Sequence, residues 1–306
     1  MNPAFSVIFL TTLIGAAQGL FLALFSAQLA GLATPAFLAT GGVVALALAV
    51  AGLVASFFHL GRPERAWRTA TMWRTSWLSR EVIALPLFMG PLFLWTLAHA
   101  LGLGYTLVLG GFTALASVAL FVCTAMIYAC LKFLQEWASP YTLVNYTLLG
   151  LASGCTLATA LAGLMAPELV GFFGAAALLF TALGLVSRWL SLLRNARLVP
   201  RSTLQSAIGI RHPKITQRAQ GFMGGSFNTR EFFHGKTPGA LRSVKWAFLL
   251  GAFVLPLALV ALGIVSASAG LLVLAFVVQY LGLLAERWFF FAQANHPQNL
   301  YYQTVS

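Results

Sequence analysis

The stretch that decides the fold reads Phe57-Phe58-His59-Leu60-Gly61-Arg62-Pro63-Glu64-Arg65-Ala66-Trp67 and continues to Trp77-Leu78-Ser79-Arg80-Glu81-Val82. A long apolar run ends at His59, a basic and Trp-rich loop follows, and a second apolar run starts just after Glu81. A titratable His and a titratable Glu therefore lie at the neighbouring ends of two predicted helices, on the same side of a membrane. Because ionisable groups at membrane depth are costly, this corner is a candidate functional site.

Composition indicates the class of protein. Of the 306 residues, 60% are hydrophobic and 8% are charged, whereas a soluble domain carries roughly 25% charged residues. So few charges cannot cover a core of this size, and the sequence predicts an all-α membrane protein. The net charge of +12 predicts no nucleic-acid partner, because basic loops are typical of one face of a membrane protein.

Eight segments are apolar enough to span a bilayer, which takes about 20 residues of helix. The whole chain, 1–306, is then a single integral membrane domain that contacts lipid. The predicted spans lie near 5–30, 39–60, 82–102, 105–130, 142–165, 168–193, 245–266 and 269–292.

The basic residues predict the orientation of these spans. With eight spans, both termini and the loops after spans two, four and six share one side of the membrane. All 18 Lys and Arg fall in or beside these segments. The positive-inside rule then places both termini, together with the His59–Glu81 corner, in the cytoplasm.

One long polar segment, the basic loop at about 195–244, lies on the same predicted side. Long irregular loops in compact proteins are usually functional or disordered, and the aromatic residues in this one argue against disorder. Two interpretations stay open. The loop lies on anionic lipid headgroups, or it is a docking surface for a soluble partner.

The distribution of titratable residues disfavours several functions. All six acidic residues are Glu in predicted loops or near predicted helix ends, which argues against an ion-coupled transporter with a midplane acid. A b-type haem needs two His at one depth, but His59 and His99 are predicted at opposite faces, about 30 Å apart. No haem is therefore predicted. The three Cys show no CxxC or Cys/His spacing, so neither an iron–sulfur cluster nor zinc is predicted in this chain.

A quinone site suits the corner better. His59 titrates near physiological pH, and Glu81 at the membrane edge can relay protons to water. Trp67, Trp73 and Trp77 could wall an apolar slot, and Arg80 could hold the Glu81 carboxylate ionised. We therefore take His59 and Glu81 as the main quinone-site candidates, with Arg80 and Trp77 as further ones. The structural alternatives are a helix-end cap for His59, an interfacial belt for the Trp residues and an anchor for Arg80.

The pattern His59-Leu60-Gly61-x-Pro63-x-Arg65-Ala66, followed by Ser79-x-Glu81, resembles the membrane-anchor subunit of dimethyl sulfoxide reductase-type molybdoenzymes. The resemblance covers the whole chain. It implies a haem-free anchor that exchanges electrons between ubiquinone or menaquinone and an iron–sulfur subunit. That subunit connects in turn to a molybdopterin catalytic subunit. The resemblance also assigns the quinone-site His to His59 and the quinone-site Glu to Glu81.

Two further stretches are similar to the anchor of the cytoplasmic sulfite-oxidising enzyme within that family. They are Met223-Gly224-Gly225-Ser226-Phe227-Asn228-Thr229-Arg230-Glu231-Phe232-Phe233 and Ala285-Glu286-Arg287-Trp288-Phe289-Phe290-Phe291-Ala292. This similarity implies that electrons from sulfite oxidation reach membrane quinone, with the partner subunits on the cytoplasmic face of a bacterial inner membrane. Three alternatives stay open: a quinol-oxidising anchor of a dimethyl sulfoxide reductase-like terminal reductase, a stand-alone transporter, and a purely structural anchor.

Overall fold

The computed structural model describes residues 1–58, 60–219, 232–300 and 302, and every regular element in these ranges is a helix. Eight helical segments of the described chain are long and apolar enough to cross a membrane, which confirms the predicted number. They are α1 (Phe5–Leu29), α2 (Pro35–Phe57), α3 (Trp77–Leu101), α4 (Thr106–Ala129), α5 (Pro140–Met165), η2 and α6 (Pro167–Leu169 and Val170–Ala196), α9, η3 and α10 (Pro238–Leu249, Leu250–Val254 and Leu255–Val265), and α11 (Ala269–Ala292). Three short helices lie outside the spans: η1 (Pro63–Ala70), α7 (Leu204–Ile208) and η4 (Pro297–Leu300).

The largest differences from the predicted span starts are at α3 and α9, which both begin earlier than hydropathy predicted. The Ser76 hydroxyl accepts a hydrogen bond from the Ser79 backbone N–H and starts α3 at Trp77, so Glu81 lies one turn inside the helix instead of before it. The Thr237 hydroxyl caps α9 in the same way, and α9 therefore takes up the last residues of the predicted 195–244 loop. N-cap side chains decide where a helix begins, whereas hydropathy marks only the part that crosses lipid.

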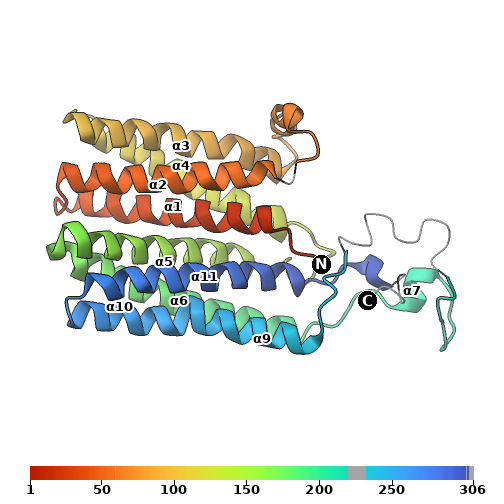
Figure 1. Cartoon of the computed structure of the whole chain (residues 1–306). Helices are drawn as coiled ribbons and strands as arrows, with labels where there is room; N and C mark the ends of the chain where they lie inside the picture. The colour runs from red at the N-terminus through yellow and green to blue at the C-terminus, as the bar shows by residue number, and fades with distance from the viewer. Residues whose placement is uncertain (59, 220–231, 301, 303–306) are drawn as a thin grey trace.

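The spans form two groups of four that pack side by side (Figure 1). One group contains α1 to α4, and the other contains α5, α6, the α9–α10 segment and α11. Helices α1 and α5 meet at the seam between the groups. A Cβ atom added to Gly154 of α5 would overlap the Gly19 backbone of α1, so these glycines permit a close approach of two helices, as is common in membrane bundles.

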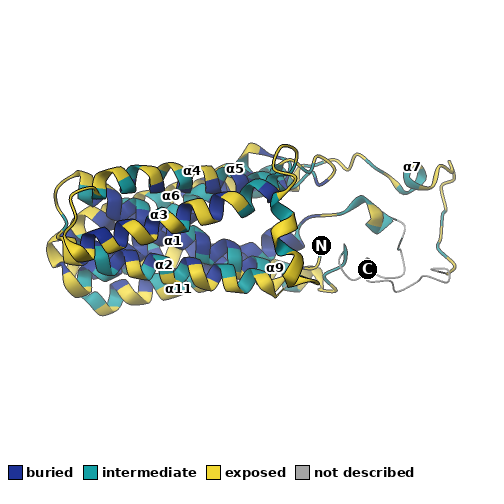
Figure 2. Cartoon of the chain, turned by 90° about the horizontal axis from the view of Figure 1, so that it is seen from above, coloured by how far each residue is buried: buried dark blue, intermediate teal, exposed yellow. Residues whose placement is uncertain are grey.

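Burial follows the pattern expected of a bundle in lipid. Inward-facing residues are buried, and the outer faces of the helices carry exposed residues along their length (Figure 2). Many of these exposed side chains are large and apolar, such as Leu115 and Val265. Exposing so large an apolar surface to water would be unfavourable. These outer faces are therefore the ones that contact lipid.

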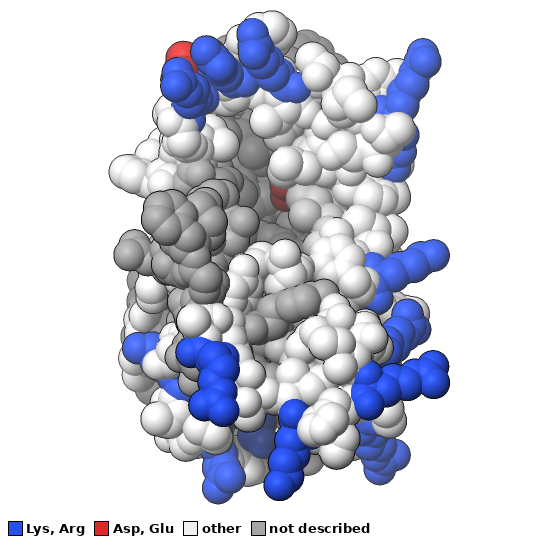
Figure 3. Space-filling view, turned by 90° about the vertical axis from the view of Figure 1, so that its right-hand side faces the viewer, with Lys and Arg blue, Asp and Glu red and all other residues white. Residues whose placement is uncertain are grey.

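Both described ends of the chain and all the longer connections lie at one end of the bundle (Figure 1). We call it the loop-bearing end; it comprises residues 1–4, 60–76, 130–139, 197–219 and 293–300. Lys and Arg side chains surround this end, and few acidic side chains appear on it (Figure 3). The opposite end has only short connections, at 30–34, 102–105, 166 and 266–268.

Candidate functional site

A pocket of about 290 Å³ lies at the loop-bearing end, between α1, α2, η1 and α3. Its size is close to the lower limit of small-molecule pockets, roughly 300 Å³. Most of its wall is apolar, and Glu81 is its one ionisable lining residue among the described residues. The lining residues are Leu10, Leu53, Ser56, Phe57, Leu60, Ala66, Trp67, Thr69, Leu78, Glu81, Val82, Leu85 and Pro86.

Glu81 is half-buried and lies about 6 Å along α3 from the helix start, one helical turn. Its Oε1 atom accepts a hydrogen bond of 2.6 Å from the Thr124 hydroxyl of α4. This distance lies at the short end of the range for O–H···O hydrogen bonds. Thr124 therefore fixes the position of a carboxyl group in the wall of an apolar pocket.

Arg80 does not hold the Glu81 carboxylate, contrary to the sequence-based interpretation. Its Nε atom donates to the Trp73 carbonyl at 2.9 Å and its Nη2 atom to the Arg74 carbonyl at 2.8 Å. The guanidinium carbon also lies 4.2 Å from the centre of the Trp77 ring. Because successive residues on a helix point in different directions, Arg80 turns towards the loop while Glu81 turns towards the bundle.

The three Trp residues of the loop take different positions. Trp67 lines the pocket, as the slot interpretation predicted. Trp73 is exposed, and Trp77 packs partly buried against the main core, outside the pocket lining. Of the three, Trp67 is thus the one placed to contact a molecule in the pocket.

His59 lies outside the described residues. Of the described residues nearest to it, Phe57 and Leu60 line the pocket, whereas Phe58 is exposed and does not. Beyond Leu60, Glu64 lies 4.0 Å from Arg62 and 3.9 Å from Arg65, with all three side chains largely exposed. Such exposed ion pairs stabilise a fold by at most about 1 kcal/mol, and we assign them no role in the site.

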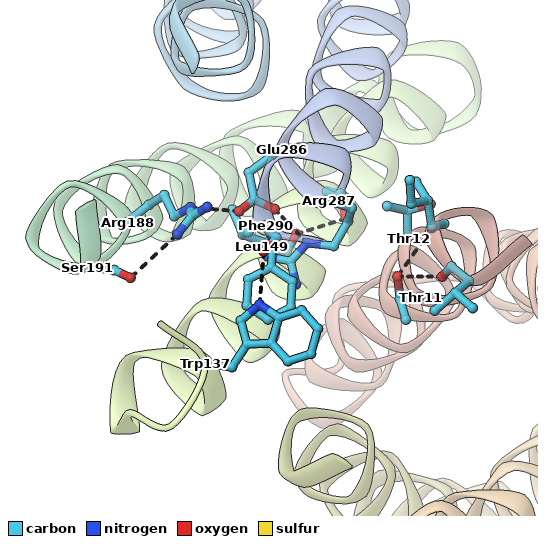
Figure 4. Close-up of polar contacts among 12 residues, drawn as sticks. Thr11, Thr12, Trp137, Leu149, Arg188, Ser191, Glu286, Arg287 and Phe290 are labelled. Atoms are coloured by element: carbon cyan, nitrogen blue, oxygen red, sulfur yellow. Dashed lines mark hydrogen bonds and ion pairs between the residues drawn. The ribbon is translucent and has the colours of Figure 1, made fainter. Parts of the chain in front are cut away.

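The structure also reveals a buried charge cluster that the sequence analysis did not identify. Glu286 of α11 is fully buried, and its two carboxylate oxygens lie 2.6 Å from Arg188 Nε and 2.5 Å from Arg287 Nε (Figure 4). Both arginines are buried too. We call these three residues the charge cluster; it carries one net positive charge. The sequence did contain one sign of this cluster, because Glu286 is an acidic residue inside an apolar run. Glu286 also lies near the end of its helix, where a charged residue is typical of the membrane surface, so the sign was not recognised.

His99 lies in the last turn of α3 at the end opposite the loop-bearing end, as predicted. It is buried, and its ring centre is 4.6 Å from that of Trp95. The Trp95 indole N–H donates to Gln28 at 2.9 Å. These contacts are those of a packed structural residue. Across 1–58, 60–219, 232–300 and 302, no group of three or more His, Cys, Asp or Glu residues is arranged to bind a metal ion.

The eight apolar spans define a multi-span integral membrane protein. One end of the bundle is basic and carries the loops, and an apolar pocket with a carboxyl group in its wall lies at that end. Residues 1–293 match the model of the DMSO reductase anchor subunit (DmsC), and the chain belongs to that family. It is 53% identical to the C subunit of the sulfite dehydrogenase of Allochromatium vinosum over 325 residues, with 100% of both chains covered. The family resemblance read from the sequence is confirmed. The chain is a membrane anchor subunit of the DMSO reductase type and a homologue of that sulfite dehydrogenase protein.

Proposed function

We propose that the chain is the quinone-reactive anchor of a molybdopterin and iron–sulfur complex, and that it passes electrons from sulfite oxidation to membrane quinone. The observation that carries the proposal is the apolar pocket whose wall contains the Glu81 carboxyl. The similarity to a component of a sulfite dehydrogenase supports the choice of sulfite as the electron source.

The pocket residues fit a quinone. Leu53, Phe57, Leu85 and the other apolar side chains suit a ring and an isoprenoid tail, and the Glu81 carboxyl supplies a hydrogen-bonding group for a carbonyl oxygen. A quinone bound there takes up two electrons and two protons to become a quinol. The electrons would come from the iron–sulfur partner of the proposed complex.

Within this proposal, the protein side chains manage the protons. His59 would donate a hydrogen bond and a proton to the quinone, since the ordinary pKa of an imidazole lies near neutral pH. Glu81 exchanges protons with the pocket, and the Thr124 hydroxyl keeps the carboxyl in position. The apolar wall excludes bulk water and so limits other proton exchange.

We expect Glu81→Gln to lower quinone-linked turnover of the assembled complex by about 10²-fold, the low end for positioned proton transfer. Gln cannot exchange a proton, so the part of the pH profile that belongs to this carboxyl should disappear. The measurement is sulfite-dependent quinone reduction at pH values from about 5.5 to about 9, on either side of the ordinary pKa of His, alongside activity with an artificial dye.

Two threonines of α4 give a matched control. Thr124→Val keeps the carboxyl but removes its hydrogen bond, and should cost about fivefold, the value of one hydrogen bond. Thr113 is buried on the same helix and donates only to the Leu109 carbonyl, so Thr113→Val should change nothing. Wild-type turnover and pH dependence in Glu81→Gln would exclude this carboxyl from the reaction.

The partner subunits would dock on the loop-bearing end. A hollow of about 990 Å³ at this end is lined by residues from separate segments, among them Glu136, His234 and Asn295. Burial lowers the pKa of His234, with smaller contributions from the positive charges of the N-terminus and Lys236. The basic side chains around this end support the cytoplasmic orientation by the positive-inside rule.

A topology experiment tests this orientation. A reporter fused after Ser306, or inserted near Gln217, should behave as cytoplasmic in the bacterial inner membrane. A reporter inserted at 102–105, in a short connection at the other end, should behave as periplasmic. Periplasmic activity at Ser306 or Gln217 would overturn both the orientation and the cytoplasmic placement of the partners.

The opposite direction of electron flow is a second candidate, favoured by the family's DMSO reductase anchor. The same pocket and carboxyl would then take protons from a quinol. Sulfite-dependent quinone reduction and quinol-dependent reduction of the partner, measured on one preparation, separate the two directions.

A further inference from the structure

Glu81 borders a second, much smaller cavity on the side away from the pocket. This inner cavity has a volume of about 20 Å³ and lies between α1, α3, α4 and α5. Its polar lining residues are Thr11, Gln18, Glu81, Thr124 and Tyr146. Glu81 therefore lines both the ligand-sized pocket and a small cavity in the bundle interior.

A third cavity continues from the inner one across the seam between the two helix groups. It also has a volume of about 20 Å³, and it shares Thr11, Gly15 and Tyr146 with the inner cavity. At its other side lies Arg287, one of the three residues of the charge cluster. Two adjoining cavities, each with several polar lining residues, thus lie between Glu81 and the charge cluster.

Each cavity is large enough for one water molecule, which needs about 10–15 Å³ and two to four polar partners. Such partners are present. The buried Tyr146 hydroxyl lies close to Arg287 and Tyr128. Neither this hydroxyl nor either Nη atom of Arg287 has a well-aligned hydrogen bond among the described residues. The Arg287 guanidinium carbon lies 4.1 Å from the centre of the Tyr146 ring. Buried donors without partners are rare and usually bind ordered water.

We propose that one water in each cavity, together with the Tyr146 and Thr11 hydroxyls, forms a hydrogen-bonded chain through which the charge cluster stabilises the carboxylate form of Glu81. This inference deepens the proposed function, because it concerns the carboxyl assigned to the quinone pocket. Arg287, Glu286 and Arg188 act here as positioning residues. Their net positive charge favours the negative charge that remains when Glu81 gives up its proton.

Few other titratable groups face Glu81. Helices α1 and α2 contain none in their sequences. On α4, Cys123 and Tyr128 are near enough to interact with the carboxylate. Arg80 on α3 is turned towards the loop, and Glu64, Arg65 and Arg68 of η1 are exposed. Among the described residues, Tyr146 therefore lies between Glu81 and the buried positive charge of Arg287.

The test is an infrared titration of the Glu81 carboxyl in the intact complex without added quinone. The band is identified by its loss in Glu81→Gln. Tyr146→Phe and Thr11→Val remove one hydroxyl each with little change in shape. Each should raise the midpoint pH of the Glu81 band by about half to one pH unit, the value of one hydrogen bond.

Tyr280→Phe is the matched control, because Tyr280 contacts Thr12 and lines neither cavity; its midpoint should equal that of the wild type. Unchanged midpoints in both Tyr146→Phe and Thr11→Val would overturn the inference, as would an equal shift in Tyr280→Phe. The two proposals fail separately. Normal quinone turnover in Glu81→Gln contradicts the quinone role, whereas the titration reports the chain of hydrogen bonds without quinone.

Discussion

His59→Gln should abolish most quinone-linked turnover of the assembled complex while its activity with an artificial dye remains at the wild-type level. Gln can still accept and donate a hydrogen bond, but it cannot exchange a proton near neutral pH as imidazole does. Loss of a catalytic proton donor typically lowers a rate about 10²–10⁴-fold. The measurement compares quinone-dependent and dye-dependent activity in one preparation of each variant.

His99→Gln is the matched control. It is the same substitution, made in the last turn of α3, and that turn lies away from the pocket. It should leave the ratio of the two activities unchanged. The prediction for His59 depends on its place in the sequence motif, because Leu60, the described residue that follows it, lines the pocket. Wild-type quinone turnover in His59→Gln would identify this residue as a helix-end cap and place the reaction elsewhere.

Glu286→Gln should strongly destabilise the protein. The substitution leaves Arg188 and Arg287 buried without their shared carboxylate. Breaking a buried ion pair by removing one partner costs about 3–5 kcal/mol. We expect a lower unfolding temperature in detergent and less protein in the membrane, measured by size-exclusion chromatography of the solubilised chain after heating.

A double-variant cycle separates this effect from a general loss of polarity. If the ion pair carries the effect, Glu286→Gln together with Arg188→Gln should cost less than the sum of the two single variants, because each removes the other's unpaired charge. Glu168→Gln, at an exposed position at the opposite end of the bundle, should be neutral. Additive effects of Glu286→Gln and Arg188→Gln would contradict an energetic link between them.

The main features of the fold were predictable because lipid imposes a simple rule on sequence. Eight apolar segments predicted eight spans, and the structure contains them within its described residues. Helix starts were less predictable. Ser76 and Thr237 cap α3 and α9 through single side-chain hydrogen bonds, which hydropathy does not detect. The 195–244 loop was therefore predicted too long at its C-terminal end.

The candidate site was predictable in part. The motif placed Glu81 beside an apolar slot, and Glu81 does line the pocket. Its partner Thr124 was not predictable, because nothing distinguishes this residue from the other threonines of the spans. The charge cluster was missed for a related reason. Glu286 and Arg188 are distant in the chain and meet only when α11 packs beside α6, and the adjacent Arg287 made Glu286 resemble part of a surface pair.

The position of the pocket, the inner cavities and the charge cluster has an energetic consequence for the cell. Glu81 and the three residues of the charge cluster all lie within about two helical turns of the loop-bearing end, so the proposed hydrogen-bonded chain between them runs along the membrane plane. If electrons and protons both enter from the loop-bearing face, as proposed, quinone reduction at this pocket would move no charge across the bilayer. Such a complex would add reducing equivalents to the quinone pool without generating a membrane potential itself. Energy conservation would then fall to whichever enzyme reoxidises the quinol.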